Sequence, residues 1–97
     1  MRERHIEQLL CRAVKKNGGI APKLVSPGFD GMPDRLRLFP GGRAAFVEVK
    51  APGAKPRPLQ LARHRLLASL GFKVYVIDDE TQIPILIDAV CKGGDAQ

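Results

Sequence analysis

The stretch GMPDRLRLFPGGRAAFVEVK, residues 31–50, holds the pattern that decides the fold of this chain. Residues 34–39 and residues 43–50 alternate between apolar and polar positions as strands do. Pro40-Gly41-Gly42 between them is typical of a hairpin turn. We therefore expect two antiparallel strands that share one face of a sheet.

Three charged side chains lie at the open end of this predicted hairpin. Side chains alternate along a strand, so Glu48 and Lys50 share one face. If the hairpin turns at its two glycines, Asp34 falls opposite Glu48 or Val49. Two neighbouring carboxylates repel each other unless a cation lies between them, and oxygen ligands suit Mg²⁺ or Mn²⁺ better than Zn²⁺. The alternative is a simple exposed ion pair of Glu48 with Lys50.

The remaining segments predict an α/β fold, a small mixed β-sheet flanked by helices. Strand, helix and strand in succession imply parallel pairing of the two strands that they join. A β-branched strand such as KVYVI is typical of the centre of a sheet. In the order α-β-β-β-α-β-α, the elements are residues 3–17 (helix), 20–25, 34–39 and 43–50 (strands), 58–70 (helix), 73–77 (strand) and 81–92 (helix). For the last of these, a strand that contains the ILI run is the alternative.

Composition is that of one small basic domain spanning residues 1–97. The chain has 16 Lys and Arg against 10 Asp and Glu, a net charge of +6, which favours a polyanionic partner such as nucleic acid. No stretch has the length of a membrane span, and the amino terminus lacks a secretion signal. Cys11 and Cys91 lie far apart, which favours reduced thiols and a cytoplasmic protein without a membrane partner.

One combination of residues resembles a known signature. Pro33-Asp34, followed after thirteen residues by Glu48-Val49-Lys50, resembles the motif of the PD-(D/E)XK nuclease superfamily. With a glutamate in the first helix, a glycine at position 31 and Gln60 on the next helix, the chain resembles the VRR-NUC family more closely. That family includes small stand-alone phage and bacterial nucleases and repair-nuclease domains. The resemblance covers about residues 3–78 in the family's order and implies a restriction-endonuclease-like core.

The resemblance implies a role for each matching residue. Asp34 and Glu48 would bind the metal, with the carbonyl of Val49 as a further ligand. Lys50 would be the catalytic amine. Gln60 would orient a water or a phosphate from the second helix, although an ordinary solvated helix residue is the alternative.

A carboxylate of the first helix would complete the metal site. Glu7 is the preferred residue by resemblance, because it lies further from the helix end, and Glu3 is its rival. The alternative for both is a helix N-terminus made favourable by negative charge.

Basic side chains follow the catalytic strand and continue onto the second helix. We expect them to bind phosphates that flank the scissile one, although a solvated helix face is the alternative. The chain has one Tyr and four Phe, which favours recognition of backbone and shape over base stacking, and His5 and His64 are interpreted as surface residues. The predicted DNA-binding residues are Lys55, Arg57, Arg63 and Arg65.

The sequence therefore predicts an Mg²⁺- or Mn²⁺-dependent endodeoxyribonuclease. By resemblance it would act as a homodimer on branched DNA such as four-way (Holliday) junctions, in DNA repair, in the cytoplasm of a bacterium or a phage-infected cell. Two alternatives stay open: a flap- or restriction-type nuclease with the same chemistry, and a DNA-binding module without catalysis.

Overall fold

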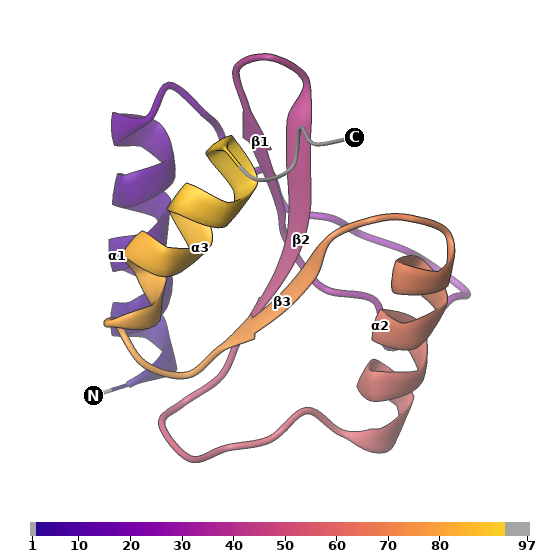
Figure 1. The fold of residues 1–97 in the computed structure, drawn as a ribbon. Coiled ribbons are helices and arrows are strands. Elements are labelled where there is room, and N and C mark those ends of the chain that lie inside the picture. The colour runs from indigo at the N-terminus through magenta and orange to yellow at the C-terminus, as the bar shows by residue number, and fades with distance from the viewer. Residues whose placement is uncertain (1, 93–97) are drawn as a thin grey trace.

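The computed structural model describes residues 2–92, in which three helices and three strands alternate (Figure 1). β1 pairs antiparallel with β2, and β2 pairs parallel with β3, so the sheet is mixed with the order β1-β2-β3. The predicted fold class is confirmed. None of the helices in this part of the chain is both long and apolar enough to cross a bilayer. The elements are α1 (Glu3–Lys16), β1 (Leu36–Phe39), β2 (Arg43–Val49), α2 (Pro58–Ser69), β3 (Val74–Ile77) and α3 (Gln82–Cys91).

The hydrophobic core lies on one face of the sheet only. α1 and α3 contact each other on that face, and α2 lies on the other side (Figure 1). α1 contributes Ile6, Leu10 and Val14, which recur every four residues and are fully buried. Burying each such side chain contributes about 1.5–3 kcal/mol. The opposing residues are Phe39, Ala45, Val47, Val49 and Ile77 of the sheet and Ile83, Leu86 and Val90 of α3.

The end of α1 fixes how closely the helix approaches the sheet. The amide of Gly18, at φ +83°, donates to the carbonyl of Lys15 at 2.9 Å, and the amide of Gly19 donates to that of Val14 at 2.9 Å. A side chain at Gly19 would place its Cβ 2.3 Å from the carbonyl oxygen of Leu38. The two glycines are needed because the chain turns directly onto β1.

The predicted strand at residues 20–25 is not formed as a regular strand. Pro22 lies within it and has no amide hydrogen to donate, although its carbonyl accepts a bond from the amide of Leu36 at 3.1 Å. The segment therefore lies along the outer edge of β1 without continuous pairing. Two isolated antiparallel bridges remain, between Ile20 and Leu38 and between Lys23 and Arg35.

Two finer expectations are wrong. β3 lies at an edge of the sheet, because β2 pairs with both other strands and is itself central. Helical spacing in residues 58–70 predicts a buried face formed by Leu59, Ala62, Leu66, Leu67 and Leu70. Of these, Leu59, Leu66 and Leu70 are instead 46%, 40% and 63% exposed. The buried residues of α2 are Gln60, His64 and Leu67.

Candidate active site

Glu48 and Lys50 share the face of β2 that is turned away from the hydrophobic core. The core residues Val47 and Val49 alternate with them along the strand. Glu48 is only 6% exposed, and its Oε2 lies 3.9 Å from Nζ of Lys50. Its other oxygen, Oε1, is buried and accepts no hydrogen bond from any residue between 2 and 92. Glu48 and Lys50 therefore lie next to each other, as predicted, and one oxygen of the Glu48 carboxylate has no hydrogen-bond partner in this part of the chain.

Asp34 is held beside this pair by the loop before β1. Pro33 is fully buried, and the carbonyl of Asp34 accepts a bond from the amide of Leu24 at 2.8 Å, whereas the Asp34 residue itself is exposed. The observed hairpin register, Leu36 opposite Phe46, sets Asp34 opposite Glu48 when it is continued past the strand end. The backbone of this loop therefore places Asp34 near enough to Glu48 for its charge to raise the pKa of Glu48.

Burial and the charged residues around Glu48 shift its pKa. Burial raises the pKa of Glu48, the charge of Lys50 lowers it, and the charges of Asp34 and Glu3 raise it again, so that the pKa lies above its usual value. The negative charges of Asp34 and Glu3 near Glu48 favour a cation at this place. Glu3 lies on α1.

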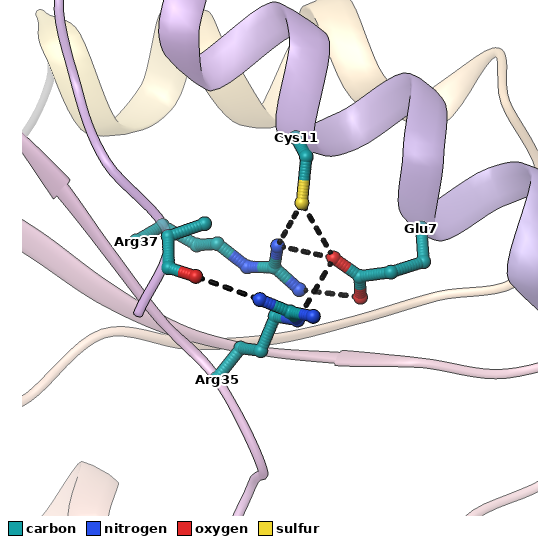
Figure 2. A network of polar contacts seen from close by, with 5 residues as sticks. Glu7, Cys11, Arg35 and Arg37 are labelled. Atoms are coloured by element: carbon teal, nitrogen blue, oxygen red, sulfur yellow. Dashed lines mark hydrogen bonds and ion pairs between the residues drawn. The ribbon is translucent and has the colours of Figure 1, made fainter. Parts of the chain in front are cut away.

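Glu7 lies on the other side of the sheet. Its carboxylate accepts two hydrogen bonds from Arg37, at 2.6 Å from Nη1 and 2.8 Å from Nη2 (Figure 2). Arg37 is fully buried and pairs with Ala45, whose side chain belongs to the core face. Because alternate residues of β2 face opposite ways, Glu7 and Glu48 are separated by the sheet.

Two more side chains complete the environment of Glu7. Arg35 Nε lies 3.3 Å from its Oε2, and the thiol of Cys11 donates to the same oxygen at 2.9 Å (Figure 2). Burial raises the pKa of Glu7, but the bonds from Arg37 and Cys11 and the two arginine charges outweigh it and leave the pKa lowered. Glu7 therefore neutralises the buried guanidinium of Arg37 on the core side of the sheet, and its role as a metal ligand stays a prediction.

His64 is the residue that sequence reasoning missed. It was interpreted as a surface residue, yet it is 9% exposed and its Nε2 lies 3.7 Å from Oε1 of Glu48. Among the described residues that nitrogen, too, has no hydrogen-bond partner. Burial and then the charge of Lys50 lower the pKa of His64. A signal existed, because His64 follows Gln60 by four residues and hence shares its helix face.

Gln60 is buried on the same side of α2, as its predicted role requires. Its Oε1 accepts a bond from the amide of Arg57 at 2.8 Å, so the side chain satisfies one of the free amides at the start of the helix. Gln60 therefore stabilises the beginning of α2 through this hydrogen bond.

Arg63 is engaged by the loop that leads to Asp34. Its Nε donates to the carbonyl of Asp30 at 2.7 Å, and its guanidinium carbon lies 3.9 Å from the ring centroid of Phe29. Gly31, at φ +90°, lies so close to α2 that a Cβ there would be 2.8 Å from Cγ of Leu59. Arg63 thus holds the loop on the helix.

Arg57, another of the predicted DNA-binding residues, lines a hollow at the start of α2. A pocket of about 430 Å³ lies between Asp30 and Gly31 on one side and residues 57–60 on the other. Gln60 lines this hollow as well. Lys55, Arg57 and Arg65 are exposed.

The donor set can accommodate a hard divalent ion. Among residues 2–92, no three His, Cys, Asp or Glu residues gather closely enough to enclose a metal ion by themselves. Mg²⁺, however, is commonly held by one or two carboxylates together with waters and substrate phosphates. Asp34 and the carboxylate of Glu48 would supply these oxygen ligands.

Comparison with known proteins places the chain in a family. No family model matches the sequence. A protein of Acyrthosiphon pisum secondary endosymbiont phage 1, named "Putative nuclease p44", is 51% identical over 86 residues, which are 89% of this chain and 92% of that protein. A solved structure described as a VRR_NUC domain superposes with a TM-score of 0.82 at 32% identity, over 89% of this chain and 94% of the other. The shared fold and the identity over nearly the full length show that this chain belongs to the VRR-NUC family.

Proposed function

We propose that this protein is a metal-dependent DNA endonuclease that hydrolyses phosphodiester bonds. The observation that carries the proposal is the buried carboxylate of Glu48, with one oxygen unsatisfied and Lys50 beside the other. A buried carboxylate oxygen without a hydrogen-bond partner destabilises a fold, and such costs concentrate at functional sites. The nuclease named among the relatives and the net charge of +6 support nucleic acid as the substrate.

Each residue of the site would have a separate task. Asp34, Glu48 and the carbonyl of Val49 would hold Mg²⁺ or Mn²⁺. When bound, the ion would polarise the scissile phosphate and supply an activated water. Lys50, positioned by its contact with Glu48, would bind a phosphate oxygen or orient the attacking water. Glu3 replaces Glu7 as the α1 carboxylate of this proposal, because its charge reaches Glu48.

A cleavage assay tests the catalytic proposal. Labelled linear, nicked, flap and four-way DNAs are incubated with Mg²⁺, with Mn²⁺ or with a chelator. We expect cleavage that requires metal, and loss of it in Lys50→Ala with the fold and DNA binding retained. Metal-independent cutting, or normal turnover by Lys50→Ala, would disprove the assignment. Binding without cleavage under every condition would favour a DNA-binding module.

We further propose that the enzyme acts as a homodimer on branched DNA. Two related active sites suit paired incisions in a two-fold symmetric junction. Three exposed apolar side chains support a contact with a second copy: Leu66 on α2, Leu70 at its C-cap and the nearby Phe72. Sedimentation velocity at micromolar concentration should show a dimer, and Leu70→Glu should shift it to a monomer. A wild-type monomer that still cuts four-way DNA would refute this part, and preference for flaps or linear sites would select the flap- or restriction-type alternative.

A further inference from the structure

The face of α2 turned toward Glu48 holds a buried side chain without an assigned task. His64 and Glu48 come from different elements, α2 and β2, and each presents an unsatisfied atom to the other: Nε2 and Oε1, 3.7 Å apart. A normal N–H···O hydrogen bond is about 2.9 Å long. The gap is therefore slightly too wide for a formed bond, and small rotations of the two side chains would close it.

The chemistry of the two groups defines the direction of that bond. A carboxylate oxygen accepts hydrogen bonds and an imidazole nitrogen without hydrogen also only accepts, so two such atoms would repel. When Glu48 is ionised, as binding of a cation requires, the nitrogen that faces it must carry its hydrogen, whether the ring is neutral or charged. Oε1 of Glu48 thus has a donor, while Oε2 faces Lys50.

We propose that His64 is a positioning residue that donates from Nε2 to Oε1 of Glu48 and so fixes the carboxylate for binding the divalent ion. The inference rests on the proposed metal-dependent function. Without a donor on Oε1, the carboxylate could turn about its last bond and would present its oxygens in many orientations. Removing an outer hydrogen-bond partner of a metal ligand typically weakens metal binding about 10–100-fold.

Calorimetric titration of Mn²⁺ into the protein without DNA tests this directly. His64→Leu keeps a buried side chain but has no donor, and we expect its Mn²⁺ affinity to fall about 10–100-fold. His64→Gln can place an N–H group where Nε2 was, and its affinity should stay within about threefold of the wild type. His5→Leu removes the other histidine, which is exposed on α1, and should change nothing. Circular dichroism and thermal unfolding without metal confirm that each variant is folded.

The outcomes separate this inference from the function on which it rests. If the wild type does not bind Mn²⁺, the metal-dependent function fails and this proposal with it. If the wild type binds and His64→Leu binds equally well, only the role of His64 is overturned. Should His64→Leu not fold, His64→Asn replaces it, because its shorter amide cannot reach Glu48. Equal Mn²⁺ affinities of His64→Asn and His64→Gln would then refute the proposal.

Discussion

Replacing Glu7 by Gln should cost stability without affecting the site. The substitution keeps the shape of the side chain but removes the charge that compensates Arg37, which is fully buried and donates bonds of 2.6 and 2.8 Å to the Glu7 carboxylate. Removing one partner of a buried ion pair costs about 3–5 kcal/mol. The side chain of Glu7 keeps 22% exposure, so solvent can partly replace it, and about 3 kcal/mol is the appropriate end of the range. At about 4 °C per kcal/mol, the melting temperature should fall by about 12 °C.

Thermal and urea unfolding at several pH values measure this effect. The folded-state pKa of Glu7 is lowered, so its contribution is present above the pKa of the unfolded chain and is lost as pH falls through the folded value. The difference between wild type and Glu7→Gln should therefore be full at pH 7 and shrink in acid below about pH 4.

The matched control is Glu3→Gln, which changes an exposed carboxylate on the same helix. It should leave the melting temperature nearly unchanged and weaken Mn²⁺ binding, whereas Glu7→Gln should bind Mn²⁺ normally. The reverse pattern, a stable Glu7→Gln that has lost metal affinity, would refute the placement of Glu7 and restore it as the α1 ligand.

Three further predictions concern the site and its surroundings. Glu48→Gln should abolish cleavage yet raise the free energy of unfolding at pH 7 by about 1 kcal/mol. Because the pKa of Glu48 is raised in the folded protein, the wild type loses stability as pH rises, and the advantage of the variant should vanish in acid. Urea unfolding at several pH values would show this. Asp34→Asn should lose Mn²⁺ affinity while its metal-free DNA affinity stays equal or rises; equal Mn²⁺ binding by both proteins would mean that the metal lies elsewhere. Arg65→Ala should reduce the slope of DNA affinity against salt by about one, and Lys16→Ala on α1 should not; equal slopes for both variants would remove Arg65 from the interface.

The hairpin could be predicted because its signals are local. Alternation and the turn at residues 40–42 fix the observed register, with Phe39 opposite Arg43, and the register determines which side chains meet. α1 is likewise specified by apolar residues at helical spacing and by the glycines that end it. These features depend only on neighbours in the sequence.

Glu7 and His64 could not be placed in this way, because their surroundings come from distant segments. A helical pattern identifies a border residue but not the element that meets it, and Arg37 lies thirty residues from Glu7. The available signal was Arg37 itself. Its position in the alternation points it to the core face, where a buried guanidinium needs a carboxylate partner. Glu7 on the covering helix supplies that partner.

The buried face of α2 was predicted wrongly from its leucines, because α2 covers a sheet face that is not apolar. Glu48 and Lys50 occupy that face, so the helix turns Gln60 and His64 toward it and leaves leucines in solvent. Helix orientation follows what the partner surface requires, and this requirement can be read only when both elements are considered together.

The arrangement along β2 links stability to the proposed chemistry. Val47 and Val49 face the core, while Glu48 and Lys50, each displaced by one residue, face the site. Moving the pairing by one residue would bury both charges among Ile6, Leu10 and Ile77 and expose the valines. The core therefore specifies the register, and the register holds the charged pair on the α2 face. This gives a physical reason why a site with an unsatisfied carboxylate can persist in so small a domain: stabilisation comes from one face of the strand, and the cost is confined to the other.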